Sequence, residues 1–356
     1  MNITEIDKNF KLTVVKEPDV KWLDIKNEPF IIKGVSYYEN EKRYRRMPEE
    51  VANRVSVGVN LLSTNTSGGR VRFVTDSPFI ALRAVIPAPG IMSHMPIVGT
   101  CGFSIYSNNN FIGMCTPDII TCSKENIVDN KVAFEGVKYP KSGKNLIEIY
   151  FPLYNGVCEL FVGIKDGCIL EKAPEYTHEL PVLFYGSSIT QGGCASRPGN
   201  DYISHLERWL DTDIYNLGFS GNAKAEQTMC DYIANQKVST YVIDYDHNAP
   251  TVEHLENTHF NLYKTIREKN ANTPIVFISK PDFDYDPFGV ERRTIIFNTY
   301  NTALKNGDKN VYYIDGETLF GDEDRDACTV DTCHPNDLGF YRMAKNIYPT
   351  LKKLLK

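Results

Sequence analysis

Two short segments of this chain carry residue types that could together perform acyl transfer. Near the C-terminus the sequence reads Asp331-Thr332-Cys333-His334-Pro335, where a histidine follows an aspartate by three residues in a turn closed by proline. This spacing lets the Nδ1–H of His334 contact the Asp331 carboxylate, which fixes the tautomer and leaves Nε2 to take a proton from a serine. Far upstream, Gly186-Ser187-Ser188-Ile189-Thr190 supplies serines in a polar turn. The two segments predict a base and a nucleophile.

A buried strand is expected to position the serine turn. The run Pro181-Val182-Leu183-Phe184-Tyr185 is apolar, and Gly186 ends it where the polar turn begins. A serine just past such a strand lies at the carboxyl edge of an α/β sheet, where the active sites of open α/β folds are found. Taken alone, each segment has another interpretation, since serine turns are common and Asp-x-x-His-Pro also suits the cap of a helix starting near Asn336.

Two intermediate segments supply hydrogen-bond donors for a developing oxyanion. Asn216–Asn222 follows the short expected strand Asp213–Tyr215, and Gly221 within it can offer a backbone N–H. Tyr241–Asn248 is an expected strand with a polar end, where the Asn248 side-chain amide can act as a second donor. The segments thus follow the order Ser, Gly, Asn, His along the chain.

This order resembles the SGNH (GDSL-type) hydrolase family, whose name lists these four residues. The matching segments run from about Pro181 to the C-terminus and are Gly186–Thr190, Asn216–Gly221, Asp244–Asn248 and Asp331–Pro335. The resemblance implies that Ser188 is the nucleophile and that His334, oriented by Asp331, is the general base. It also implies that Gly221, Asn248 and the backbone N–H of Ser188 form the oxyanion hole.

The match departs from the family pattern at two positions. Ser187 stands where the first block usually has aspartate, a residue that supports the loop and is not part of the triad. Ala249 stands where the third block usually has an aspartate after the asparagine, and alanine cannot repeat its hydrogen bonds. The first departure bears on loop geometry more than on chemistry.

The rest of the sequence divides into two regions of different periodicity. Before about residue 170, short alternating segments broken by turns, such as Phe79–Ile86 and Asn145–Phe151, predict an antiparallel β-sandwich of jelly-roll type. No helix of ordinary length is expected there, apart from a turn around Pro48–Asn53. We predict a sandwich domain over residues 1–175.

After the boundary, strands alternate with helical segments. Val252, Leu255, His259, Leu262 and Ile266 share one helical face, and apolar runs such as Pro274–Ser279 indicate buried strands. This alternation predicts a three-layer α/β/α domain with a parallel, flavodoxin-like sheet over residues 176–356, connected through a linker near Lys172–Glu179.

The amino-acid composition of the chain disfavours several classes of function. The 356 residues are 42% apolar and 24% charged with a net charge of −6, which disfavours nucleic acid or an anionic membrane as a partner. No signal peptide or membrane-spanning run is evident, and nine cysteines without C-x-x-C spacing suggest reduced thiols and a cytoplasmic location. The pattern calls for no metal and no cofactor. A homodimer is one option for the oligomeric state, which the sequence leaves open.

Three further residues are candidates for contact with substrate. Arg197 follows the nucleophile segment, His247 precedes Asn248 at the expected sheet edge, and His94 lies in the loop Pro87–Pro96 of the sandwich. Each also has an ordinary structural interpretation as a surface, supporting or loop residue. The chain has 21 tyrosines and 18 phenylalanines, and tyrosine rings stack well on sugars.

We therefore expect an esterase that removes O-acetyl groups from carbohydrates, with acetylated plant oligosaccharides such as mannan or xylan as the expected substrates, through an acyl-enzyme intermediate. One alternative is a lipid or thioester acylhydrolase that uses the same residues. A second alternative is a carbohydrate-binding protein whose hydrolase half has decayed, which the residues Ser187 and Ala249 would suggest.

Overall fold

The computed structural model describes residues 15–118, 122, 126–281 and 286–355. The chain forms two compact units. The first contains residues up to Arg46, Thr64–Glu175 and Ser196–Gly199, and the second contains Met47–Ser63, Tyr176–Ala195 and the chain from Asn200 onward. Each unit has its own core of buried apolar side chains.

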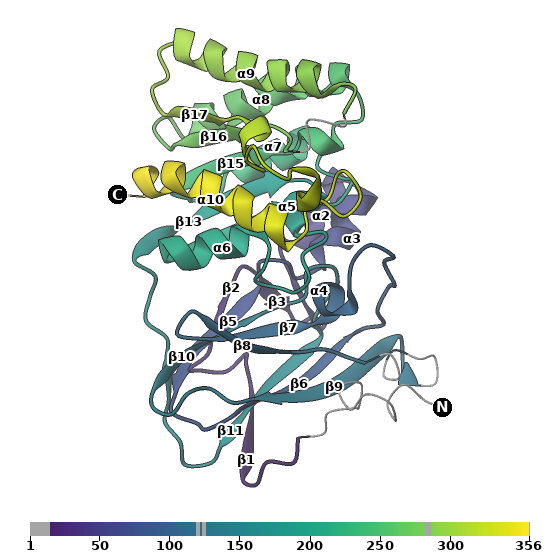
Figure 1. Ribbon diagram of the computed structural model, residues 1–356, viewed down its shortest axis with the longest axis vertical. Helices are drawn as coiled ribbons and strands as arrows, with labels where there is room; N and C mark the ends of the chain where they lie inside the picture. The colour runs from purple at the N-terminus through teal and green to yellow at the C-terminus, as the bar shows by residue number, and fades with distance from the viewer. Residues whose placement is uncertain (1–14, 119–121, 123–125, 282–285, 356) are drawn as a thin grey trace. The chain divides into compact units, whose positions relative to one another are not determined.

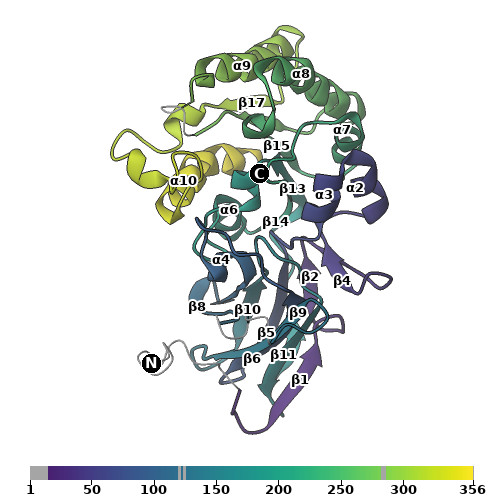
Figure 2. The same ribbon diagram turned by 90° about the vertical axis from the view of Figure 1, so that its right-hand side faces the viewer.

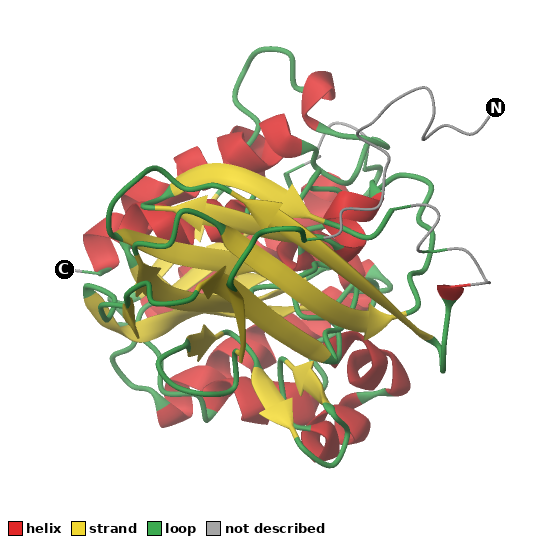
Figure 3. Ribbon diagram, turned by 90° about the horizontal axis from the view of Figure 1, so that it is seen from below, coloured by secondary structure: helices red, strands yellow, loops and turns green. Residues whose placement is uncertain are grey.

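The first unit is an antiparallel β-sandwich, whose strands are among those drawn in yellow in Figure 3. One sheet has the order β1-β11-β6-β9, and the other has the order β12-β5-β10-β7-β8 with β2 paired to β5; β3 and β4 form a separate hairpin. The strands are β1 Val20–Asp24, β2 Ile31–Lys33, β3 Ser36–Tyr38, β4 Arg43–Arg45, β5 Arg70–Thr75, β6 Ile80–Pro87, β7 Phe103–Ser107, β8 Asn110–Cys115, β9 Lys131–Lys138, β10 Asn145–Tyr150, β11 Glu159–Lys165 and β12 Leu170–Lys172.

Alternation along the strands builds the core of this sandwich. On β10, Ile147 and Ile149 are fully buried in the apolar cluster shared by the two sheets. Glu148 points to the other face of its sheet, where its carboxylate accepts a hydrogen bond of 2.8 Å from Nε of Arg72 on β5. Side chains along these strands thus alternate between the inner and the outer face, which is the two-residue periodicity from which the strands were predicted.

The second unit is a three-layer α/β/α fold around a five-stranded parallel sheet of order β14-β13-β15-β16-β17. Its strands are β13 His178–Gly186, β14 Thr212–Gly218, β15 Thr240–Asp244, β16 Ile275–Ile278 and β17 Val311–Ile314. Its helices include α5 Ser188–Gln191, α6 Tyr202–Leu210, α7 Gln227–Ala234, α8 Val252–Lys269, α9 Gly289–Lys305 and α10 Asp337–Leu354. This confirms the predicted fold class.

The helices of the second unit cover both faces of the sheet (Figure 2). On one face, the ring of Phe184 contacts that of Tyr202 on α6, and Tyr202 stacks on Phe340 of α10. On the other face, Leu183 and Tyr185 belong to a buried cluster with side chains of α7, α8 and α9. Helices α8 and α9 and the labelled strands of the sheet can be followed in Figure 1.

The units divide between Glu175 and Tyr176, and two segments, Met47–Ser63 and Ser196–Gly199, belong to the other unit; the predicted domain bounds stay a prediction. Two helices, α2 Glu49–Val55 and α3 Val57–Ser63, belong to the second unit because Ala52 and Val59 are buried in its apolar cluster. The expectation of a mere turn around Pro48–Asn53 was therefore wrong. A further short helix, α4 Ile97–Cys101, lies in the first unit, and so does the segment Ser196–Gly199.

The register of the parallel sheet brings three strand ends to the same level. Gly186 at the end of β13 is paired with Gly218 on β14 and with Asp244 on β15. The polar segments that follow these strands therefore start side by side.

None of the described helices is long and apolar enough to cross a membrane, and the nine cysteines are free thiols. The cytoplasmic location stays a prediction.

Candidate active site

The structure places Ser188, His334 and Asp331 in one hydrogen-bonded chain. Ser188 Oγ lies 2.8 Å from His334 Nε2, and His334 Nδ1 lies 2.8 Å from Asp331 Oδ2. Ser188 begins helix α5 directly after β13, whereas the other two residues come from the loop before α10. This arrangement can remove a proton from the serine hydroxyl while the carboxylate stabilises the resulting imidazolium.

A tight turn fixes the aspartate against the histidine. The backbone N–H groups of Cys333 and His334 donate to Asp331 Oδ1 over 3.2 and 2.7 Å, while Oδ2 receives the ring. Burial on its own raises the pKa of the Asp331 carboxyl, but the hydrogen bonds from His334 outweigh it and hold that pKa below its usual range. The carboxyl is therefore ionised at neutral pH. Thr332 has a φ of +66°, a costly conformation for a β-branched residue.

Ser187 caps the N-terminal end of helix α5. Its Oγ accepts a hydrogen bond of 3.1 Å from the N–H of Ile189, so it is the N-cap residue of the short helix that begins with Ser188. Its own N–H donates to the carbonyl of Asp244 over 3.3 Å. The serine that replaces the usual aspartate therefore supports the nucleophile segment through its hydroxyl and its backbone.

Two glycines allow α5 to lie directly on the strand ends. A Cβ on Gly186 would lie 2.0 Å from Thr190 Oγ1 and 2.3 Å from the carbonyl oxygen of Asp244. A Cβ on Gly218 would lie 2.3 Å from the backbone nitrogen of Gln191. Since real Cβ contacts are longer than 3 Å, any side chain at either position would push the nucleophile helix away from the sheet.

The loop after β14 is tied to α5 by side-chain amides. Asn216 Nδ2 donates to the carbonyl of Thr190 over 2.8 Å, and the N–H of Ser220 donates to Gln191 Oε1 over 3.0 Å. Gly221 follows with a φ of +67°, which favours glycine. Within the described ranges of the chain, the Gly221 N–H has no hydrogen-bond acceptor. This donor is available to a ligand.

Asn248 ends the short 3-10 helix η3 Asp246–Asn248 after β15. Its Oδ1 accepts a hydrogen bond of 3.3 Å from the N–H of Ala223, two residues after Gly221. The acceptor end of the amide is therefore engaged by the same loop that carries Gly221. This leaves Nδ2 as the donor that the Asn248 side chain can offer to an oxyanion.

Arg292 on α9 holds the backbone on both sides of Asn248. Its guanidinium donates to the carbonyl of Asp246 over 2.6 Å and to the carbonyl of Ala249 over 3.0 Å. Asp246 in turn accepts the N–H of Lys280 over 3.0 Å. Ala249 lacks a carboxylate, but an arginine from another helix anchors its backbone. The sequence analysis missed this role.

A signal for this role exists in the sequence. Arg292 and Arg293 are the fourth and fifth residues of α9, close to the end where the helix dipole disfavours cations. Two arginines at such a position indicate specific acceptors nearby. Arg292 finds them in the carbonyls of the Asn248 loop, and Arg293 finds them in Asp315 and Glu317.

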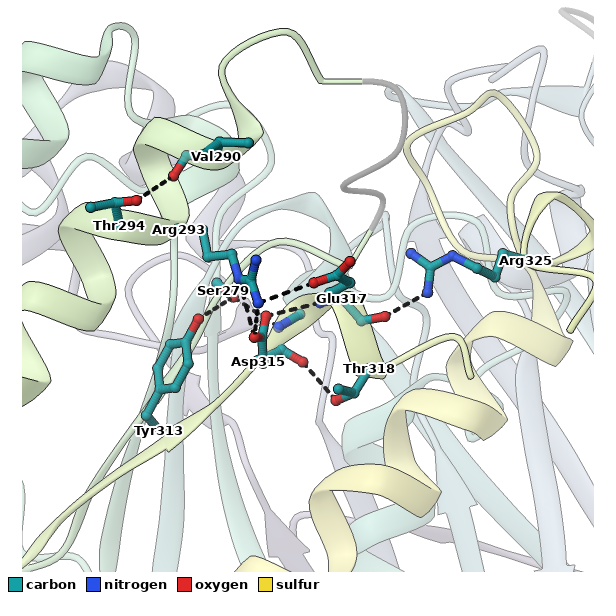
Figure 4. A network of polar contacts seen from close by, with 10 residues as sticks. Ser279, Val290, Arg293, Thr294, Tyr313, Asp315, Glu317, Thr318 and Arg325 are labelled. Carbon is teal, nitrogen blue, oxygen red and sulfur yellow. Dashed lines mark hydrogen bonds and ion pairs between the residues drawn. The ribbon is translucent and has the colours of Figure 1, made fainter. Parts of the chain in front are cut away.

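The loop that carries Asp331 and His334 begins after β17 in a polar network (Figure 4). Arg293 forms ion pairs with Asp315 and, over 3.0 Å, with Glu317. Arg325 continues the network by donating to the carbonyls of Glu317 and, over 3.0 Å, Gly321. These contacts fasten the start of the loop to helix α9.

The end of the same loop is fastened to α10. Arg342 on this helix donates to the carbonyls of Phe320 and Glu323 over 2.8 and 2.6 Å. Asn336 caps α10 through Oδ1 and donates from Nδ2 to the carbonyl of Ala327 over 2.7 Å. Both ends of the long loop are thus held, which restricts the His334 ring.

His247 contacts the base loop. Its Nδ1 lies 3.7 Å from Sγ of Cys333, the residue before His334. Burial, together with the positive charges of Lys280 and Arg292, keeps the pKa of His247 well below its usual range, so the ring is neutral. This contact links the Asn248 segment to the His334 segment. A role in substrate binding stays a prediction.

Arg197 and His94 both belong to the first unit. Arg197 Nη1 donates to the hydroxyl of Tyr106 over 2.6 Å, and its guanidinium lies 3.7 Å from the ring centroid of Phe111. These contacts are typical of an arginine that anchors its own loop on an aromatic surface. His94 lies in the loop between β6 and α4, as expected. Contact of either residue with substrate stays a prediction.

Two family models match the chain. One, described as the GDSL-like lipase/acylhydrolase family, matches residues 179–352. The other, described as the N-terminus of SGNH-hydrolase-type esterases, matches residues 20–170. A search of curated protein sequences returned no match.

Solved structures resemble the chain over nearly its whole length. A GDSL-like lipase candidate from Bacteroides ovatus is 25% identical, with a TM-score of 0.81, and the match covers 94% of this chain and 98% of that one. The salicylyl-acyltransferase SsfX3 of a tetracycline biosynthetic pathway is 20% identical, with a TM-score of 0.75 and coverages of 95% and 98%. A family two carbohydrate esterase from Clostridium thermocellum, solved with cellohexaose, is 13% identical, with a TM-score of 0.63 and coverages of 92% and 99%. The last two likenesses concern the fold alone.

Proposed function

The chain belongs to the SGNH (GDSL-type) hydrolase family, and from this premise we propose that it is a serine esterase that removes O-acetyl groups from carbohydrates. The observation that carries the proposal is the chain of two 2.8 Å contacts that joins Ser188, His334 and Asp331. Such a chain activates a serine for attack on an ester carbonyl.

In the acylation step, Ser188 Oγ attacks the carbonyl carbon of the acetyl ester while His334 Nε2 takes the hydroxyl proton. The carbonyl oxygen becomes an oxyanion, which accepts hydrogen bonds from the N–H groups of Ser188 and Gly221 and from Nδ2 of Asn248. When the tetrahedral intermediate collapses, the C–O bond to the sugar breaks and His334 returns its proton to the sugar oxygen. The products are a free sugar hydroxyl and acetyl-Ser188.

Deacylation repeats these roles with water as the nucleophile. His334 takes a proton from water, the resulting hydroxide attacks the acetyl carbonyl, and the second oxyanion occupies the same three donors. Collapse returns the proton from His334 to Ser188 Oγ and releases acetic acid, which ionises to acetate in water. Asp331 stays ionised throughout, because the hydrogen bonds from His334 lower the pKa of its carboxyl.

The substrate class is the finer part of the proposal. A carbohydrate esterase that was solved in complex with cellohexaose has a similar fold over 92% of this chain and 99% of its own. The sequence also provides 21 tyrosines, whose rings are suited to stacking on sugars. Acetylated plant oligosaccharides, such as those of xylan or mannan, are therefore the substrates that we propose to test first.

Mass spectrometry of acetylated xylan, mannan and chitin oligosaccharides tests this function. After incubation with the protein, the proposal expects losses of acetyl mass from at least one of these sugars and none with Ser188→Ala. A series of aryl esters with acyl chains of increasing length should show fastest hydrolysis of the acetate. Preference for long chains would favour a lipid acylhydrolase. Sugar binding without hydrolysis would favour a decayed enzyme.

A further inference from the structure

Asp244 is a carboxyl in a place where a charge is costly. It is the last residue of β15, four positions before Asn248, and its side chain is 1% exposed. In the part of the chain that the structure describes, no lysine, arginine or histidine forms an ion pair with it, and its Oδ1 is buried without a hydrogen-bond partner. A carboxylate in such surroundings would carry a large desolvation cost.

The other oxygen of Asp244 has two hydroxyl neighbours. Oδ2 lies 3.0 Å from the hydroxyl of Tyr202 on α6 and 3.3 Å from Oγ1 of Thr190 on α5. The two hydroxyls are themselves 3.4 Å apart. Three polar groups from three elements thus share one small buried cluster, in which each O–H can find an oxygen.

The charged and titratable groups around this cluster are acidic. Asp246, two residues after Asp244, is buried and adds a repulsive charge. Tyr202 faces Asp244 from α6, and Asp201 precedes Tyr202 as the N-cap residue of that helix. The side of Asp244 toward α5 offers the neutral Thr190. Burial first, and Asp246 second, hold the pKa of Asp244 well above its usual range.

We propose that Asp244 is a positioning residue that works as a neutral carboxylic acid and holds the nucleophile helix α5 on the sheet through Thr190. A neutral carboxyl can donate to one hydroxyl and accept from the other, and it tolerates a buried oxygen without a partner better than a carboxylate does. The effect on catalysis rests on the proposed function, since it concerns the placement of Ser188.

The geometry shows why this cluster matters for Ser188. Helix α5 has only four residues, so its position depends on the contacts at both ends. Its N-cap residue, Ser187, donates to the backbone carbonyl of Asp244, and Thr190 contacts the Asp244 side chain. The space is closed on the strand side, because a Cβ added to Gly186 would lie 2.0 Å from Thr190 Oγ1 and 2.3 Å from the carbonyl oxygen of Asp244. One residue of β15 therefore contacts both ends of α5.

Asp244→Asn is the informative variant, because an amide imitates the neutral acid and cannot ionise. If the folded state raises the pKa of Asp244, this residue adds to the free energy of unfolding at low pH. That contribution is lost as the pH rises from the pKa of Asp244 in the unfolded chain to its pKa in the folded protein. Measured from about pH 5 to about pH 9, the Tm of the wild type should fall relative to that of Asp244→Asn. Parallel Tm curves would overturn the proposal, and this readout does not depend on any catalytic role.

Activity provides the second readout. Near pH 7, kcat for an aryl acetate should stay within about threefold of wild type in Asp244→Asn and fall by roughly 10–100-fold in Asp244→Ala, which leaves the two hydroxyls with only each other as partners. Thr190→Ser should keep kcat and Thr190→Val should lower it.

Equal losses of kcat in Asp244→Asn and Asp244→Ala, in folded proteins, would mean that the negative charge of Asp244 is needed and would overturn the proposal. If Ser188→Ala were active, the proposed function would fail, whereas the Tm test would still stand.

Discussion

Removing the Asn248 side chain tests whether it stabilises the transition state. The amide Oδ1 is engaged by the N–H of Ala223, so the geometry leaves Nδ2 for the substrate. A donor aimed at an oxyanion acts on a charge that exists only in the transition state. We therefore expect Asn248→Ala to change kcat strongly and KM little.

The magnitude has two parts that can be measured separately. Loss of one oxyanion donor lowers kcat by roughly 10²–10³, which corresponds to about 2.7–4 kcal/mol of transition-state stabilisation. Loss of Oδ1 also removes one of the two acceptors of the Ala223 N–H, which keeps the Phe219 carbonyl at 3.2 Å, so the free energy of unfolding should fall by at most about 0.5–1.5 kcal/mol. The second effect is too small to explain the first, and a thermal unfolding curve reports it directly.

Asn248→Asp is the matched control. A carboxylate can still accept the N–H of Ala223, so the loop should keep its position and the Tm should fall less than in Asn248→Ala. The same carboxylate cannot donate to an oxyanion and repels it, so kcat should fall at least as far as in the alanine variant. Steady-state kinetics with an aryl acetate measure both variants. A change in KM alone, or an active Asn248→Asp enzyme, would show that Asn248 binds the ground state or has no role in the reaction.

Three further predictions concern the same site. Ser188→Ala should lower turnover of an aryl acetate by several orders of magnitude, whereas Ser187→Ala should remove only the N-cap of α5 at a cost of roughly 1 kcal/mol; the reverse outcome would make Ser187 the nucleophile. Asp331→Asn should lower kcat by roughly 10²–10⁴, because an amide cannot stabilise the imidazolium of His334; an unchanged kcat would contradict the assigned role. Arg292→Ala should lower kcat about tenfold by freeing the Asn248 loop, while Glu291→Ala on the same helix should have no effect, and equal kcat values in the two variants would show that the loop does not need Arg292.

The candidate residues could be selected from the sequence because each follows a strand that its apolar run makes recognisable. Parallel strands place their carboxyl ends at one edge, so the segments after β13, β14 and β15 start at the same level once the register pairs Gly186 with Gly218 and Asp244. The spacing of Asp331 and His334 needs only a local turn. Chemistry that depends on strand ends and short turns is readable without a structure.

The supporting residues could not be selected in this way, because their partners are distant in sequence. Arg292 binds carbonyls more than forty positions away, and no local pattern names those acceptors. Helices α2 and α3 lie inside a region of strand-like alternation, yet Ala52 and Val59 are buried among side chains of the second unit. Burial in a core that is formed by later parts of the chain is a tertiary property that the period of a short segment does not encode.

The two departures from the family pattern have different physical consequences. Ser187 keeps a side-chain oxygen at the position that caps α5, so the substitution removes a charge and retains the hydrogen bond to the Ile189 N–H. Ala249 keeps no polar side chain, and its segment is held instead through backbone carbonyls by Arg292. A backbone acceptor does not depend on the identity of the residue that carries it, so this support is compatible with alanine at position 249. In this chain the backbone on both sides of Asn248 is thus held from α9 by Arg292, and the Arg292→Ala variant tests whether the proposed oxyanion donor depends on that support.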